Sequence, residues 1–265
     1  MNELPYFCDM GNPTINELYE YVLHSLDGSS YLKSEEGYSH IICPGLTFDI
    51  YIAQAAYPNI EETNQKRKIS ISQEQLVQQF VKIRNRLKVL SGKAQKIYAR
   101  ETVLARIDKK QTLEFQEEHH LQIALPGKYR YGLYYKGELV SIAIFSGGRK
   151  MHEKPLDYRS FELLRFCQKS DHLVIGGLSK LLKAFIKDFN ANDIMTYVDL
   201  DWSQDSSLKK LGFEEKGIKK GENLWISGNR QFIITDDKML METIENHPNG
   251  FLHKNTGSIK LVLAV

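Results

Sequence analysis

The sequence predicts a mixed α/β (α+β) fold, on the basis of a hairpin in residues 130–145 and a strand, glycine turn, helix and strand in residues 161–200. In the hairpin, aromatic and β-branched residues suited to a pleated surface flank a turn at Lys136-Gly137. Glycine supplies the positive φ that a tight turn needs. Two antiparallel strands are therefore expected here.

The second unit begins with strand candidates in residues 161–167 and 173–175, followed by Gly176 and Gly177. Apolar residues then recur from Leu178 to Phe189 at i, i+3, i+4 and i+7, which predicts a helix with one buried face. Residues 193–200 form another strand candidate. Such a unit is normally a right-handed parallel crossover, so it should lie at the centre of the sheet.

Length and composition favour a folded intracellular protein. The chain has 265 residues, of which 42% are hydrophobic, enough for one large domain or two small ones. It shows no secretory signal and no apolar run of the roughly 18 residues that span a bilayer, so we expect a cytoplasmic protein without a membrane partner. Cys8, Cys43 and Cys167 form no CxxC pair, so free thiols and no metal site are expected.

Three segments follow from these patterns. Residues 1–70 form an N-terminal segment, an α/β extension with a strand at residues 48–52 and a polar linker candidate at 61–70. Residues 71–95 carry a connecting amphipathic helix that starts at the N-cap Ser72 and ends at Ser91-Gly92. Residues 96–265 form the main domain.

The stretch from Lys82 to Arg106 is locally basic, although the whole chain carries a formal charge of only +2. Such a stretch is either a solvated helix face or a surface that contacts the phosphates of a nucleic acid. Both interpretations stay open from the sequence.

The paired glycines suggest an anion site. A helix that starts at glycines can direct unpaired backbone N–H groups and its positive dipole end at a pyrophosphate, and Lys180 can add a charge there. The alternative is a purely structural tight turn.

The order of these elements, with Lys209-Lys210-Leu211-Gly212-Phe213 after the last strand, resembles the GNAT superfamily of N-acetyltransferases. The resemblance implies a mostly antiparallel mixed sheet with a central parallel β-α-β crossover, and acetyl-CoA or another acyl-CoA as cofactor. Val174 and Ser179 depart from the family's loop pattern, and Leu208 stands where its general-acid tyrosine is usual. The implied cofactor-binding residues are Arg165, Phe166, Cys167 and Gln168 on the strand, and Val174, Ile175, Gly176, Gly177, Leu178, Ser179 and Lys180 at the loop.

Residues 96–213 more narrowly resemble an uncharacterised GNAT-like module of phages and mobile elements, sometimes fused to homing or very-short-patch-repair-type nucleases. Matching stretches include residues 115–122 (FQEEHHLQ) and 162–167 (ELLRFC). In the fused nuclease, a segment like residues 48–52 would carry a metal-binding aspartate. Asp49 matches, but residues 53–56 (AQAA) give no acidic partner, so an active nuclease is not expected.

Several side chains are candidates for the chemistry. Glu162, Asp199 and Asp201 are the candidate bases for an amine acceptor, with turn and capping carboxylates as the alternative. Tyr197 and Ser203 are possible replacements for the missing tyrosine. His119 and His120 close a helix-like segment and either cap it or face the substrate.

The sequence thus predicts an acyl-CoA-dependent N-acyltransferase with an unknown amine acceptor, which the phage resemblance links to DNA modification. The alternative is a non-catalytic nucleic-acid-binding or accessory protein on the same scaffold.

Overall fold

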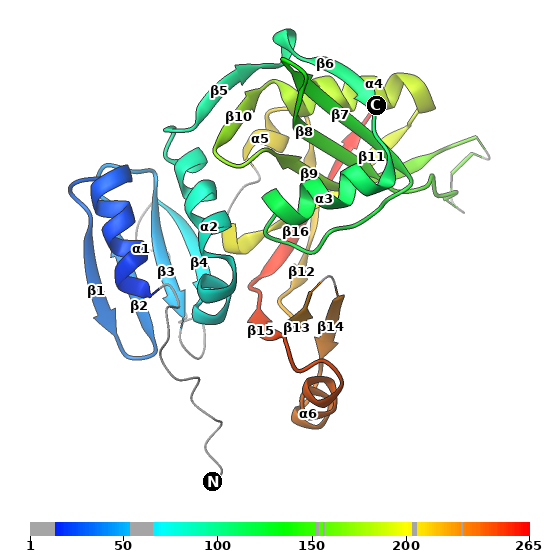
Figure 1. Cartoon of the computed structure of the whole chain (residues 1–265). Coiled ribbons are helices and arrows are strands. Elements are labelled where there is room, and N and C mark those ends of the chain that lie inside the picture. Colours follow the sequence, from blue (N-terminus) through cyan, green and yellow to red (C-terminus); the bar gives the residue numbers. More distant parts are fainter. Residues whose placement is uncertain (1–13, 54–65, 152–153, 156, 203–205, 229) are drawn as a thin grey trace.

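The computed structural model describes residues 14–53, 66–151, 154–155, 157–202, 206–228 and 230–265 (Figure 1). Its N-terminal part is a four-stranded sheet of order β1-β2-β3-β4 in which only the last pair is parallel. The elements are α1 (Ile15–Tyr21), the π-helical turn η1 (Val22–Leu26), β1 (Tyr31–Glu35), β2 (Tyr38–Ile42), β3 (Phe48–Ala53), β4 (Arg67–Ser72) and α2 (Gln73–Leu90).

Helix α2 belongs to the core of this N-terminal part. Its Leu76, Ile83 and Leu87 are fully buried in one cluster with the strand residues. The predicted N-cap is confirmed, because the Ser72 hydroxyl accepts the Gln75 N–H at 3.1 Å. The linker expected at 61–70 is wrong from residue 67 onward, because the alternating Ile69 and Ile71 of β4 are fully buried; residues 61–65 lie outside the described part.

The main sheet has seven strands in the order β6-β7-β8-β9-β11-β16-β12. Every neighbouring pair is antiparallel except the central pair β9 and β11. This arrangement confirms the predicted fold class. The strands are β6 (Val103–Arg106), β7 (Tyr129–Tyr135), β8 (Glu138–Phe145), β9 (Ser160–Gln168), β11 (Asp193–Asp199), β12 (Glu214–Lys220) and β16 (Gly257–Ala264).

The predicted hairpin is formed by β7 and β8, and its turn residues Lys136 and Gly137 have φ values of 50° and 84°. One prediction about the crossover is wrong. The run at residues 173–175 does become β10 (His172–Ile175), but it pairs in parallel with β5 (Gln95–Tyr98), outside the main sheet. The parallel partner of β11 is β9, because the chain turns back after Gln168 and reaches α4 by way of β10.

Helices cover both faces of the main sheet. On one face, α4 (Gly177–Phe189) buries its apolar stripe, and the Phe185 ring stacks on Phe145 with centroids 3.8 Å apart. On the other face, α3 (Lys109–His119) packs Phe115 against β8 and β9. The residues between β11 and β12 form the short turn η3 (Leu200–Trp202) and α5 (Ser206–Lys209).

An excursion between β12 and β16 forms a small sheet of order β14-β13-β15 (Figure 1). Its elements are β13 (Asn223–Ser227), β14 (Arg230–Ile234), α6 (Asp237–Asn246) and β15 (Phe251–Lys254). Trp202 of η3, only 4% exposed, inserts into the N-terminal core and joins the two larger parts. No helix of the described residues is long and apolar enough to cross a membrane.

Candidate active site

The central parallel strands separate soon after they meet. Strands β9 and β11 pair over three positions, from Ser160 with Asp193 to Glu162 with Met195. Beyond this point, the Thr196 hydroxyl donates to the Leu163 carbonyl at 2.9 Å. A register shift between β8 and β9 then inserts Leu164 as an extra residue. The result is a fork that opens toward the carboxyl ends of β9 and β11.

The β9 arm of the fork presents backbone donors to the gap. The Lys169 N–H donates to the Val140 carbonyl at 2.9 Å, which fixes the alternation of the ladder between β8 and β9. In an antiparallel pair, every second residue directs its N–H away from the partner strand. The N–H groups of Phe166 and Gln168 therefore point toward β11, which no longer pairs with β9 there.

Helix α4 starts at a left-handed residue. Gly176, the N-cap, has φ 78°, which a side-chain-bearing residue rarely adopts. Its carbonyl accepts the Lys180 N–H at 3.0 Å. The preceding amides, those of Gly177, Leu178 and Ser179, have no hydrogen bond to any other described residue. Three donors and the positive end of the helix dipole therefore point outward at this end of α4.

Two of the predicted cofactor-binding residues, Gly177 and Lys180, make contacts within the protein at the start of α4. A Cβ on Gly177 would lie 3.1 Å from the Val174 Cγ1 and 3.2 Å from its Cβ, so a larger residue here would be tightly packed against Val174. The Lys180 ammonium donates to the carbonyls of Ala99 at 2.8 Å and Thr102 at 2.5 Å. The expected charge of Lys180 at the anion site is therefore directed into the turn after β5 instead.

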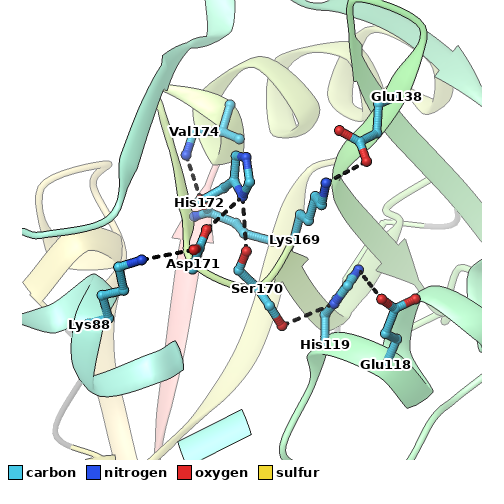
Figure 2. Close-up of polar contacts among 10 residues, drawn as sticks. Lys88, Glu118, His119, Glu138, Lys169, Ser170, Asp171, His172 and Val174 are labelled. Carbon is cyan, nitrogen blue, oxygen red and sulfur yellow. Dashed lines mark hydrogen bonds and ion pairs between the residues drawn. The ribbon is translucent and has the colours of Figure 1, made fainter. Parts of the chain in front are cut away.

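The segment from β9 to α4 is held by polar contacts (Figure 2). Asp171, with φ 58°, forms an ion pair with Lys88 of α2 at 2.9 Å, and the His172 Nδ1 lies 2.9 Å from the Ser170 carbonyl oxygen. The Gln168 Oε1 accepts the Val174 N–H at 2.6 Å. The end of β9 is thus fixed beside the strand that leads into Gly176.

The two histidines lie inside the protein. His119 has a side chain only 7% exposed, its Nδ1 lies 3.1 Å from the Ser170 hydroxyl, and its ring packs edge-on against Phe115. Burial lowers the pKa of His119, and burial lowers the pKa of His120 to about 3 with further help from Arg165 and Arg86. Both rings are therefore neutral near pH 7, and His119 serves to hold the Ser170 turn.

The two aspartates at the end of β11 form a connected pair. The Asp199 Oδ1 accepts the Asp201 N–H at 2.9 Å, and its Oδ2 lies 3.4 Å from the Gln122 amide nitrogen. Asp201 is only 1% exposed, and its Oδ1 accepts the N–H and hydroxyl of Thr256 at 2.9 and 2.6 Å. Burial, followed by the charge of Asp199, raises the pKa of Asp201 to about 8.

His253 of β15 completes this cluster, and sequence reasoning missed it. Its Nε2 lies 3.8 Å from the Asp201 Oδ2, an atom that has no hydrogen-bond partner among the described residues. Burial lowers the pKa of His253. The residue lies 52 positions after Asp201 in the sequence, and no motif singled out in the sequence includes it.

The remaining candidate side chains do not join this cluster. Glu162 forms an ion pair with Arg149 and lies opposite Met195 in the β9–β11 ladder. Met195 precedes Asp199 by four residues, which is about 13 Å along β11. Tyr197 is 46% exposed. Ser203 lies outside the described residues. Leu208, at the family's tyrosine position, is buried in the apolar core.

The basic stretch from Lys82 to Arg106 does not form one open face. Most of its side chains have partners within the protein: Lys82 with the His120 carbonyl, Arg84 with the Tyr21 ring, Lys88 with Asp171, Lys93 with the Ser25 carbonyl and Arg106 with Asp188. The geometry therefore offers little support for the nucleic-acid interpretation of this stretch.

Asp49, the nuclease-like aspartate, has a structural environment. Its Oδ1 accepts the Cys43 N–H at 2.8 Å, and Lys66 and His40 lie 3.7 and 3.9 Å from its carboxylate. Among the residues that the structure describes, no group of three or more histidine, cysteine, aspartate or glutamate side chains is placed to hold a metal ion.

No family model matches this chain, and no curated protein matches it. Solved structures similar to it include three acetyltransferases. They are the ribosomal-protein-S18-alanine N-acetyltransferase from Escherichia coli (14% identity, 62% of this chain and 94% of that chain, TM-score 0.38), a GNAT family acetyltransferase from Elizabethkingia anophelis with acetyl-CoA bound (13%, 62% and 99%, 0.35) and an acetyltransferase from Bacillus subtilis in complex with CoA (14%, 62% and 99%, 0.36). At these identities and TM-scores, the likeness carries no statement about activity.

Proposed function

We propose that this chain is an acyl-CoA-dependent N-acyltransferase, with acetyl-CoA as the first donor to test. The observation that carries the proposal is the fork between β9 and β11. It lies beside a helix that begins at the left-handed Gly176 with three unpaired amides. Unpaired amides at a helix start suit a diphosphate, and a strand with free N–H groups suits an amide-bearing chain such as pantetheine.

The bound cofactor would supply an activated thioester. The amides of Gly177, Leu178 and Ser179 would hold the diphosphate through charge-assisted hydrogen bonds. The amides of Phe166 and Gln168 would position the acyl carbonyl and stabilise the negative charge that develops on its oxygen when an amine attacks. One such donor is worth about 2.7 to 4 kcal/mol in related sites.

Asp199 is the proposed general base. An alkylammonium group must lose a proton before its nitrogen can attack, so the base must be ionised and must reach the substrate. The raised pKa of Asp201, about 8, keeps that carboxyl protonated at neutral pH, and its burial removes it from the acceptor. Asp199 is half-buried, and its Oδ1 accepts the Asp201 N–H, so Asp201 acts as its positioning residue. Its Oδ2 has the long 3.4 Å contact with the Gln122 side chain.

The substitution Ser179→Glu tests the cofactor site without destabilising the fold. A carboxylate in the first turn of a helix stabilises the helix, while it repels a diphosphate at the same amides. We expect wild type to bind acetyl-CoA with a saturable calorimetric signal, and Ser179→Glu to bind at least about ten-fold more weakly, or about 1.4 kcal/mol. The matched control, Ser179→Gln, should keep binding. Equal binding by all three proteins, or none by wild type, contradicts the proposal.

One observation favours a second candidate, a non-catalytic accessory protein that binds acyl-CoA. The buried Leu208 provides no proton for the departing thiolate, and the exposed Tyr197 hydroxyl would have to replace it. Release of free CoA, followed with a thiol reagent over a panel of amines, separates the two. Binding of acetyl-CoA without amine-dependent CoA release by any acceptor would favour the accessory function.

The acceptor expected from the phage resemblance, a base amine in DNA, has no structural support so far. Most cations of the stretch from Lys82 to Arg106 contact the protein itself. The side chains next to the fork point to a different kind of acceptor.

A further inference from the structure

Helix α2 turns one polar stripe toward the fork. Gln79, Lys82 and Arg86 are spaced i, i+3 and i+7, which places them on one side of the helix. The Gln79 amide donates to the Leu121 carbonyl at 2.8 Å, and the Lys82 ammonium donates to the His120 carbonyl at 3.0 Å. This side of α2 therefore packs against the segment that follows α3.

Arg165 of β9 reaches the same segment from the main sheet. Its guanidinium donates to the Leu164 carbonyl at 2.8 Å and to the Ile123 carbonyl at 3.4 Å. Its Nε is buried and has no partner among the described residues. Two separate parts of the fold thus bring cationic side chains to the residues 120–123.

Arg86 has no countercharge in contact. Its side chain is half-buried, and no hydrogen bond or ion pair to it occurs among the described residues. Burial lowers the pKa of Arg86 to about 10. The Cys167 thiol, the one group whose charge would favour it, has a pKa that burial raises to about 12, so it stays neutral.

The other titratable groups do not neutralise the cluster. His120 is neutral because burial and the charges of Arg165 and Arg86 lower its pKa. The charges of Glu162 and Asp199 raise the pKa of Arg165, and the charge of Glu117 raises the pKa of Lys82. In both cases burial lowers the pKa more than any of these charges raises it. A partly buried cation without a countercharge costs free energy in a folded protein, so the half-buried Arg86, together with the unpartnered buried Nε of Arg165, suggests a ligand that supplies the negative charge.

We propose that Lys82, Arg86 and Arg165 bind an anionic group, a carboxylate or a phosphate, on the acceptor. The inference rests on the proposed function, because the segment 120–123 that Lys82 and Arg165 contact also reaches Asp199 through Gln122. Asp199, the proposed base, acts electrostatically on Arg165. The favoured acceptor is therefore a small molecule that carries both an amine and an anionic group, and the planar guanidinium of Arg86 matches either oxyanion.

The test uses inorganic phosphate and succinate as separate probes, in thermal-shift titrations against sodium chloride at equal ionic strength. Wild type should give a saturable shift with one probe, and the responding probe assigns the anion as phosphate or carboxylate. Arg86→Gln should weaken that response about ten-fold or more. Arg84→Gln, an exposed arginine on the other side of the same helix, is the matched control and should keep it.

Two further variants separate this site from its rivals. Ser179→Glu should keep the part of the response that Arg86→Gln loses, because the α4 amides form a different anion site. Without any probe, Arg86→Gln should be at least as stable as wild type, since it removes a half-buried charge that has no countercharge in contact. If Arg86→Gln does not fold, or is clearly less stable, Arg86 has a structural partner and the inference is wrong. Lys82→Gln provides a second, independent weakening of the response.

Acetyl-CoA binding, measured in the same proteins, distinguishes the two proposals. Normal acetyl-CoA binding by wild type and Arg86→Gln, with no saturable anion response or an equal response in both, overturns the anion site alone. Failure of wild type to bind acetyl-CoA overturns the proposed function, and an anion response lost in Arg86→Gln would then define a ligand site without that activity.

Discussion

Replacing Asp201 by asparagine should make the stability of this protein less dependent on pH. The carboxyl is almost completely buried, accepts two hydrogen bonds from Thr256 and leaves Oδ2 without a hydrogen bond, 3.8 Å from His253. An asparagine has the shape of the protonated acid and keeps the oxygen that accepts from Thr256. The variant therefore imitates the form that the wild-type protein holds at neutral pH.

The magnitude follows from the pKa of Asp201, which rises from 3.8 in the unfolded chain to about 8 in the folded protein. Between these values the folded state binds more protons, so the free energy of unfolding falls as the pH rises. Each pH unit costs at most about 1.4 kcal/mol. From pH 5.5 to 7.5 the wild type should therefore lose up to about 3 kcal/mol that the variant keeps.

Urea unfolding followed by tryptophan fluorescence at pH 5.5, 6.5 and 7.5 measures this difference. The neutral His253 contributes in the opposite direction below pH 6.5, but it is present in both proteins. We expect the free energy of unfolding of Asp201→Asn minus that of wild type to increase by about 2 to 3 kcal/mol over this range. The control Asp236→Asn, at an exposed helix cap, should show no such increase. A constant or decreasing difference would refute the raised pKa.

Three further outcomes are expected. Asp199→Asn should lower kcat by about 100-fold or more while the Kd for acetyl-CoA stays unchanged, as measured by amine-dependent CoA release and calorimetry. Lys180→Met should lower the free energy of unfolding by about 1 to 3 kcal/mol, because it leaves the carbonyls of Ala99 and Thr102 without their donor; an effect on acetyl-CoA affinity alone would contradict this. Trp202→Ala should cost about 3 to 5 kcal/mol in urea unfolding, since this side chain joins two parts of the fold.

Local patterns predicted the elements that form around the site. The hairpin turn at Lys136-Gly137, the cap at Ser72 and the apolar stripe of α4 are each encoded within a few residues, and all three are confirmed. Strand pairing is not encoded in this way. The run at residues 173–175 has the composition of a strand, but only the separation of β9 from β11 decides that it pairs with β5.

The site itself depended on contacts that no local pattern reveals. His253 meets Asp201 across 52 residues and an inserted sheet, so its role has no signal in the surrounding sequence. Arg86 stood in a basic stretch, where a solvated face or a phosphate-binding face were the natural interpretations. Its neighbours Ile83 and Leu87 are fully buried, and position 86 lies beside them on the helix, which leaves its side chain half-buried rather than fully in solvent.

The N-terminal part is therefore a component of the proposed site and not only an extension before it. Helix α2 anchors its apolar side in the N-terminal core, and its polar side carries Arg86 and Lys82, which contacts the segment after α3. In the opposite direction, the chain leaves Asp199 and Asp201 and at once inserts Trp202 into that same core. One packed core thus sets the positions of the proposed base and of the proposed anion site. The boundary that the sequence predicts at residue 95 therefore does not separate two independent functions.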